Sequence, residues 1–266
     1  SKDQAINPLE FTMGLRFPLE HEFTQMKSFI SSLVTPPEAK GQPFINTSDV
    51  VGAILRTVFE LANDRNSVNK ANRYMRFNDN DLDKIMIKHG LIKEHGSEGR
   101  DITYFALRDY FHSIGEERGR TLAHRYAMPT VGDMISAISH ASIVEVYKDT
   151  RIGAEPALGF LLQQILNAKN TFPAFFYHTN FDIGNARVAS IDLNDVASQS
   201  NPKSTSLFFQ IVRMFIKRKF AVSHEDLPMF PPEYHDYASA VIRELLEDRK
   251  IMSYDELHVA GGDPVL

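Results

Sequence analysis

The sequence predicts a mainly α-helical chain with a partial α/β layer toward its C-terminal end. Through residues 12–170, apolar side chains recur at the three- and four-residue spacing of helices that bury one face. After about residue 171, two short stretches have the character of strands. We therefore expect a helical domain over residues 12–170 and a partial α/β segment over residues 171–266, with residues 1–11 pairing with that segment.

The expected helices of the first block are separated by proline, glycine and capping residues. Pro18 suits the first turn of a helix, Ser48 and either Asn80 or Asp79 suit N-caps, and Gly90 suits a C-terminal stop. Thr130 is expected to cap one continuous helix that reaches Tyr147. These helices cover residues 18–33, 51–62, 82–86, 102–114, 116–128, 131–147 and 155–169.

The second block combines two helices with two strand-like stretches. Helical spacing predicts helices over residues 203–220 and 233–249, joined by a proline-rich loop. Arg187–Leu193 alternates apolar and polar residues, which is the period of a half-buried strand. Ile251–Tyr254 is a short apolar run that also predicts a strand. These features are the basis for the α/β segment.

Composition excludes several classes of protein. The 266 residues carry 29 Lys and Arg against 34 Asp and Glu, a net charge of −5, which disfavours a surface dedicated to coating nucleic acid. There is no cysteine, so disulfides, Cys-ligated zinc and thiol nucleophiles are excluded. The 19 Phe and 9 Tyr argue against disorder. No apolar stretch approaches the ~20 residues that span a bilayer.

The motif with the clearest chemistry follows the expected strand at Ile251–Tyr254. Asp255 and Glu256 come directly after it, as in a Walker B motif, where the Asp holds Mg²⁺ through its hydration shell and the Glu polarises the attacking water. A solvated strand end that happens to be acidic is the alternative. The partner motif, G-x-x-x-x-G-K-[ST], occurs nowhere in the sequence, so this chain is not expected to cradle a triphosphate by itself.

Other catalytic or metal-binding patterns are weak. The ten His include no His-x-x-x-His pair, and no G-x-S-x-G motif is present. One basic cluster suits a contact with phosphate or with a neighbouring subunit, or else a solvated helix face balanced by Glu116 and Glu117. The cluster consists of Arg118, Arg120, His124 and Arg125.

Several segments together resemble one family. They are Ala5-Ile6-Asn7-Pro8-Leu9, Gly14-Leu15-Arg16-Phe17-Pro18-Leu19, His124-Arg125-Tyr126-Ala127-Met128-Pro129, Ala186–Ala197, Pro232-Glu233-Tyr234-His235-Asp236-Tyr237 and Tyr254-Asp255-Glu256-Leu257-His258. In order and spacing they are similar to segments of the large ATPases of type IV secretion and conjugation systems, the family that includes IcmB (also called DotO) and TraU.

This resemblance implies a RecA-like ATPase core with a large helical insertion between Walker A and Walker B. The chain would span from just after Walker A to just past Walker B, and the partial α/β layer would be RecA-like. Glu256 would be the catalytic residue, and Asp255 would bind the nucleotide's Mg²⁺ indirectly. ATP and Mg²⁺ are then cofactors of the intact parent, with none expected on this chain alone.

The resemblance also implies partners and a location. The parent would form a hexamer or another homo-oligomer at the cytoplasmic face of the bacterial inner membrane. It would work with other subunits of the secretion or conjugation apparatus and with the transferred DNA or protein. A helical adaptor without catalytic activity remains an alternative, as does a metal-dependent hydrolase that uses Asp255 and Glu256.

Overall fold

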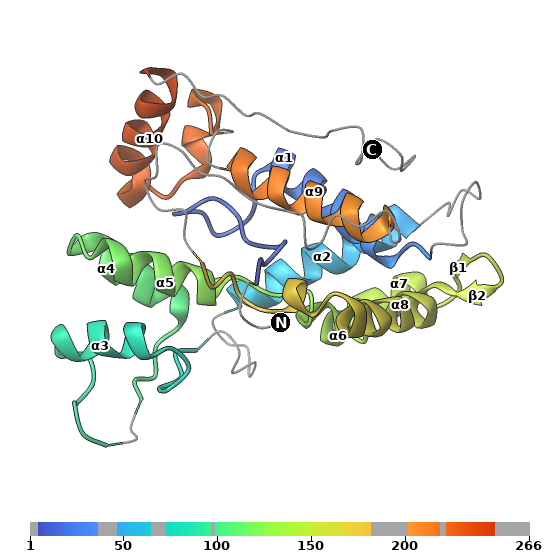
Figure 1. The fold of residues 1–266 in the computed structure, drawn as a ribbon, viewed down its shortest axis with the longest axis horizontal. Helices are drawn as coiled ribbons and strands as arrows, with labels where there is room; N and C mark the ends of the chain where they lie inside the picture. Colours follow the sequence, from blue (N-terminus) through green and yellow to red (C-terminus); the bar gives the residue numbers. More distant parts are fainter. Residues whose placement is uncertain are drawn as a thin grey trace.

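The computed structural model describes residues 5–36, 47–64, 73–96, 99–181, 202–218 and 222–247. This part of the chain is mainly helical, with one two-stranded antiparallel ribbon (Figure 1). Its elements are α1 (Glu20–Val34), α2 (Thr47–Asn63), α3 (Asn80–Lys88), α4 (Tyr104–Ser113), α5 (Glu117–Ala127), α6 (Asp133–Ile138), α7 (Ala141–Tyr147), β1 (Arg151–Ile152), β2 (Glu155–Pro156), α8 (Ala157–Thr171), η3 (Pro173–Phe176), α9 (Pro202–Arg218), η4 (His224–Met229), η5 (Pro232–Tyr234) and α10 (His235–Glu247).

The mainly helical class predicted from sequence is confirmed, whereas the α/β layer has no counterpart in these residues. The strands expected at Arg187–Leu193 and Ile251–Tyr254 lie outside the described residues. Within the described ranges, β1 and β2 form the only sheet, and no RecA-like layer is present. The RecA-like segment therefore stays a prediction.

Helices α1 and α2 form the centre of the core, and periodicity predicted their buried faces correctly. The apolar residues expected on α1 and α2 are all buried, and the two helices pack together. Two expected boundaries shift. Pro18 precedes α1, which begins at Glu20, and Ser48 lies within α2 instead of capping it. Capping motifs mark helix ends only to within a residue or two, so these shifts leave the faces unchanged.

The α4–α5 hairpin makes the most extensive helix–helix contact in the described chain, and α3 packs against α5. Asp79 caps α3 as expected, since its carboxylate accepts hydrogen bonds from the backbone of Asp81 and Leu82 at 2.9 and 2.8 Å. Gly90 follows the end of α3 in the left-handed conformation (φ +65°), which is also as expected. In Figure 1, α10 lies above this hairpin and α3 lies below it.

The continuous helix expected over residues 131–147 is wrong. The chain forms two short helices, α6 and α7, separated by Ser139 and an extended His140. The ring of His140 hydrogen-bonds to the hydroxyl of Ser142 at 2.8 Å, and such local side-chain bonds compete with helical continuation. The apolar spacing of residues 131–147 also predicts a buried Val146, whereas this side chain is 67 % exposed.

The N-terminal segment is held against residues 174–180, at the start of the second expected segment, by hydrogen bonds across some 170 residues. The amide of Ile6 donates to the carbonyl of Ala174 at 3.2 Å, and the amide of Asn7 donates to the Thr179 hydroxyl at 3.1 Å. The amide of Asn180 donates in turn to Ala5. These bonds place residues 5–11 in the core beside α1 and α2. Among the described residues, no helix is long and apolar enough to cross a membrane.

Candidate functional site

The predicted Walker B residues, Asp255 and Glu256, lie outside the described residues. The structure instead brings together other segments on which the resemblance depends. Residues from Gly14-Leu15-Arg16, from the His124 stretch and from the Tyr234 stretch surround one buried side chain, Arg108 of α4. We call Arg108 and the groups around it the Arg108 assembly.

Arg108 is fully buried, and each nitrogen of its guanidinium group has a partner. Nη1 donates to the carbonyl of Leu15 at 2.6 Å, and Nη2 donates to that of Gly14 at 3.3 Å. Nε donates to Oδ1 of Asp109 at 2.9 Å, and Nη2 lies 2.8 Å from the same oxygen. Because an unpaired buried cation is very costly, this complete set of acceptors is what permits the burial.

The neighbours of His124 require its neutral form. Its Nε2 lies 2.8 Å from the carbonyl of Phe11, which can only accept a hydrogen bond, while Nδ1 lies 3.5 Å from the donor Nη1 of Arg108. The ring therefore donates through Nε2 and presents a lone pair through Nδ1. Burial, reinforced by the charge of Arg108, lowers the pKa of His124 to about 3.

Asp109 and Tyr234 complete the assembly at its outer edge. Asp109 forms an ion pair with Arg16 and accepts a hydrogen bond from the Tyr234 hydroxyl at 3.1 Å. The guanidinium of Arg108 lies over the Tyr234 ring, 5.2 Å from its centroid. Burial raises the pKa of the Tyr234 hydroxyl, so it remains a hydrogen-bond donor near neutral pH.

A glycine is required where Tyr234 meets the N-terminal segment. Gly14 has a φ of +94°, and a Cβ at this position would lie 2.6 Å from a ring carbon of Tyr234. Both the conformation and the space therefore exclude a side chain. The Tyr234 ring of η5 can therefore pack against the backbone at residue 14 only because that residue is a glycine.

The same tyrosine anchors α10 to the α4–α5 hairpin. The ring of His112 stacks on Tyr234 with centroids 3.9 Å apart and an interplanar angle of 11°. Its Nε2 lies 2.8 Å from the carbonyl of Glu233, and its Nδ1 lies 3.2 Å from a guanidinium nitrogen of Arg120. Arg120 also lies over the ring of Tyr237, 4.5 Å from the centroid. Residues of α4, α5, η5 and α10 are therefore joined in one contact.

A second link joins two more of the resembling segments. The side-chain amide of Asn7, which is buried, donates to the carbonyl of Pro129 at 2.9 Å. The Asn7 carbonyl oxygen accepts from the amide of Leu9 at 3.0 Å. Asn7 thus connects the N-terminal motif to the stretch that ends at Pro129.

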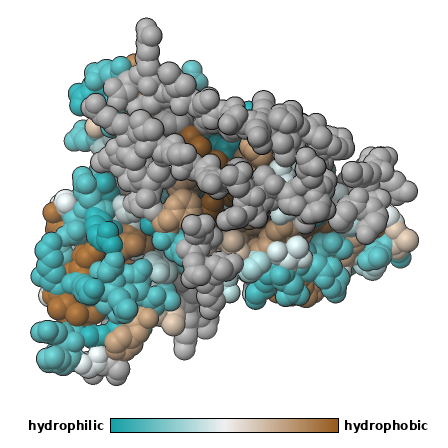
Figure 2. Space-filling model, viewed as in Figure 1, coloured by the Kyte–Doolittle hydropathy of each residue, from teal (hydrophilic) through white to brown (hydrophobic). Residues whose placement is uncertain are grey.

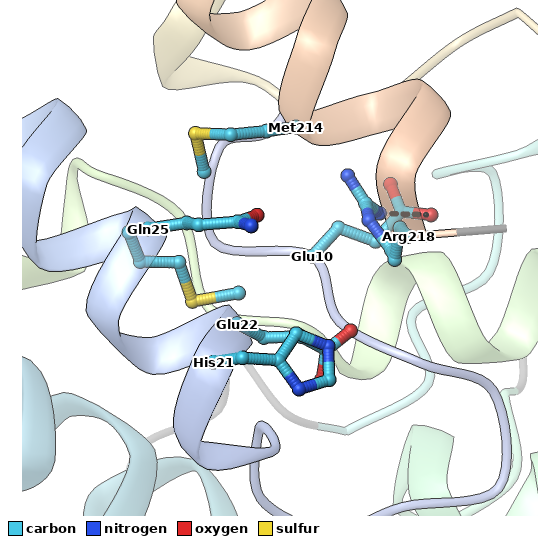
Figure 3. A pocket seen from close by; sticks show the side chains of 7 residues that line it. Glu10, His21, Glu22, Gln25, Met214 and Arg218 are labelled. Carbon is cyan, nitrogen blue, oxygen red and sulfur yellow. Dashed lines mark ion pairs between the residues drawn. The ribbon is translucent and has the colours of Figure 1, made fainter. Parts of the chain in front are cut away.

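One small pocket lies between the N-terminal segment, α1 and α9 (Figure 3). Glu10 and Arg218 form an ion pair of 3.2 Å at one side of the pocket, and both side chains are 12 % exposed. Glu22 accepts hydrogen bonds from Thr12 and Leu19, at 2.8–2.9 Å, and the Nε2 of His21 is buried without a partner among the described residues. The space amounts to about 10 Å³, which suits one water molecule and excludes an organic substrate.

The basic cluster expected on α5 does not form one face, and Glu116 does not balance it. His124 is buried, Arg120 packs on α10, and Arg118 pairs with Asp81 of α3 at 2.5 Å. Glu116 pairs instead with Lys88 and His89, at 2.9 and 3.0 Å. Helical spacing placed these side chains on α5 correctly, but their partners come from other elements.

The described residues include no group of three His, Asp or Glu side chains arranged to hold a metal ion. Arg108, Asp109 and Tyr234 contact one another in the Arg108 assembly. No motif in the sequence marked Arg108 or Asp109 as functional, and Tyr234 was named only as part of a resembling segment. One signal was present for Arg108. It lies four residues after Tyr104 and three before Phe111, so a charged residue occupies the apolar face of its helix.

Comparison with known proteins identifies no relative: no protein-family model, no curated protein and no solved structure matches this chain.

Proposed function

We propose that this chain belongs to an ATPase that powers type IV secretion or conjugative transfer, to which it contributes a helical domain and the Walker B residues Asp255 and Glu256. The single observation that carries the proposal is the convergence of the resembling segments. Residues of four of them, separated by up to some 220 positions, contact one another directly or through Arg108. Such convergence is expected if these segments maintain a common fold.

The proposal assigns the nucleotide to a site completed outside this chain. The sequence lacks a P-loop, so ATP and Mg²⁺ are held by the intact ATPase with a P-loop from elsewhere. When ATP and Mg²⁺ are bound, Asp255 would help to hold the Mg²⁺ ion and Glu256 would polarise the attacking water. The intact ATPase forms a hexameric ring at the cytoplasmic face of the inner membrane and acts with other transfer subunits on DNA or protein.

The direct test is Glu256→Gln in the full-length ATPase. Phosphate release should stop while a fluorescent ATP analogue still binds, because the amide fills the same space but cannot polarise water. Glu145→Gln, an exposed change on α7, is the matched control and should leave both measurements unchanged. Phosphate release at the wild-type rate from Glu256→Gln would remove the Walker B assignment. The 266-residue chain alone should not hydrolyse ATP.

The runner-up function is a helical adaptor without catalytic activity. The helical character of the described residues and the missing P-loop favour it. An adaptor predicts that Glu256→Gln and Glu145→Gln behave alike in every assay of transfer, whereas the ATPase predicts that only Glu256→Gln abolishes transfer. A metal-dependent hydrolase that uses Asp255 and Glu256 has weaker support, because no motif in the sequence supplies a third ligand for them.

A further inference from the structure

Helix α10 is attached to the α4–α5 hairpin near its first turn. Tyr234 directly precedes the helix, and its ring stacks on the ring of His112 of α4. Within that first turn, the ring centroid of Tyr237 lies 4.5 Å from the guanidinium of Arg120 on α5. The same ring packs edge-on against His112. We call His112, Arg120, Tyr234 and Tyr237 the α10 anchor.

The α10 anchor fixes the orientation of the helix as well as its contact with the hairpin. The Nδ1 of His112 lies 3.2 Å from a guanidinium nitrogen of Arg120, and its Nε2 lies 2.8 Å from the carbonyl of Glu233. Ala238 and Ile242 of α10 are also buried. Apolar packing is not directional, however, whereas hydrogen bonds and stacked rings are. The anchor therefore sets the angle between α10 and the hairpin.

The rest of α10 has few other contacts that could set this angle. In the described part of the chain the helix packs mainly on η4 and η5, which directly precede it in the sequence. Hydrophilic residues predominate where α10 reaches the visible surface (Figure 2). Most of its exposed residues are charged, namely Asp236, Arg243, Glu244 and Glu247. The helix is therefore held near its N-terminal end.

The predicted Walker B residues follow the opposite end of α10 in the sequence. Asp255 and Glu256 lie outside the described residues, eight and nine positions after Glu247, the last residue of the helix. The 13 residues of α10 make a helix about 20 Å long, so a tilt of about 10° at the anchor displaces its far end by about 3 Å. A misplacement of about 1 Å can cost an enzyme about 100-fold in rate. The angle of α10 is therefore large enough in effect to matter for catalysis.

We propose that the α10 anchor positions the Walker B carboxylates. By setting the angle of α10 on the α4–α5 hairpin, His112, Arg120 and Tyr237 determine the direction in which the chain continues toward Asp255 and Glu256. They act through the helix, so they are positioning residues and not catalytic ones. The inference rests on the proposed function, because the position of Glu256 matters only if this residue polarises the attacking water.

The first measurement is the distance between α4 and α10 in the 266-residue chain. Because the chain has no cysteine, Ala106→Cys and Ala240→Cys, which are both exposed, provide two unique sites for spin labels. Double electron–electron resonance should give a narrow distance distribution for this pair. Arg120→Met or Tyr237→Leu should broaden or shift the distribution, since each removes one side of the contact. An unchanged distribution would overturn the proposal, because the anchor would then not set the angle of α10.

The second measurement is steady-state hydrolysis by the full-length ATPase. Arg120→Met and Tyr237→Leu should lower kcat about 10–100-fold while the KM for ATP stays within about twofold, because the P-loop that holds the nucleotide is elsewhere. Tyr237→Phe keeps the ring that faces Arg120 and should recover most of kcat. Arg118→Met is the matched control, since it removes a guanidinium of the same helix that pairs with Asp81 of α3. It should hydrolyse ATP like the wild type.

The readouts separate positioning from folding and from the proposed function. Rates are expressed per bound fluorescent ATP analogue, so a loss of folded protein does not lower kcat. A wild-type kcat in Arg120→Met and Tyr237→Leu, or an equal loss in Arg118→Met, would overturn the positioning role. If Glu256→Gln hydrolyses ATP at the wild-type rate, the Walker B assignment fails and this inference fails with it. If Glu256→Gln is inactive while the anchor variants keep the wild-type kcat, only the positioning role fails.

Discussion

Arg108 and Phe77 both depart from the usual rule that charged side chains are exposed and aromatic side chains are buried. Arg108 is a cation in the core, whereas Phe77 is an aromatic ring at the surface. In both places a buried hydrogen-bond network makes the arrangement possible. The carbonyls of Gly14 and Leu15 serve Arg108, and the carboxylate of Asp83 holds the backbone of Phe77.

The difference lies in what each network stabilises. Around Arg108 the hydrogen bonds satisfy the buried group itself, so removing that group leaves its acceptors unpaired. Beneath Phe77 they hold a strained backbone whose side chain makes little contact with the core. We therefore expect changes at Arg108 to lower the stability of the fold strongly, and changes at the exposed Phe77 to alter it only slightly.

The largest effect is expected from Arg108→Ala. The change leaves the carbonyls of Gly14 and Leu15 without their donor, removes a partner of Asp109, and opens a cavity. The free energy of unfolding should fall by about 3–5 kcal/mol, as measured by urea denaturation. Arg118→Ala is the matched control, because Arg118 is exposed and pairs with Asp81 at the surface. This change should lower the free energy of unfolding by less than ~1 kcal/mol. Equal losses for the two variants would contradict the role assigned to the buried network.

An intermediate effect is expected from pH through His124. Its pKa is about 3 in the folded chain and about 6.5 when exposed, so the unfolded chain binds the extra proton between these values. Stability is therefore complete above pH 6.5 and decreases as the pH falls toward 3. At pH 5 the titration of His124 alone should lower the free energy of unfolding by about 2 kcal/mol relative to pH 8.

His124→Gln isolates that contribution from other titrating groups. Glutamine can still donate to the carbonyl of Phe11 but does not titrate, so urea denaturation at several pH values should show a shallower loss between pH 6.5 and 5. The remaining slope includes His178, whose pKa is also lowered by burial. Identical slopes for the wild type and His124→Gln would show that His124 is not held neutral by the fold.

The smallest effect on stability is expected from Phe77→Gly, and its sign is reversed. Glycine adopts a φ of +67° without steric cost, so the free energy of unfolding, measured by urea denaturation, should rise by about 0.5–1 kcal/mol. Phe77→Ala removes the ring but keeps the strained backbone, so it should not gain stability. A clear loss of stability in Phe77→Gly would show that the Phe77 ring supports the fold.

Much of the helical architecture could be predicted from the sequence, because helix formation and capping depend on neighbours within a few residues. The apolar spacing in α1 and α2 gave their buried faces, and Asp79 and Gly90 marked the ends of α3. The same local reasoning failed at Ser139 and His140, where a side-chain hydrogen bond ends one helix and begins another. The Walker B prediction at Asp255 and Glu256 stays a prediction.

The sequence alone determined the helical class, most helix boundaries and the exclusion of cysteine chemistry, since each depends on composition or on short-range periodicity. Tertiary structure decided the environments of Arg108, His124 and Tyr234. The acceptor that permits Arg108 to be buried lies 93 residues away at Leu15, and Tyr234 reaches Asp109 across 125 residues. A charged residue on an apolar helix face indicates that a partner must exist. Only the packing of distant segments, which brings donors and acceptors within hydrogen-bonding distance, shows which partner it is.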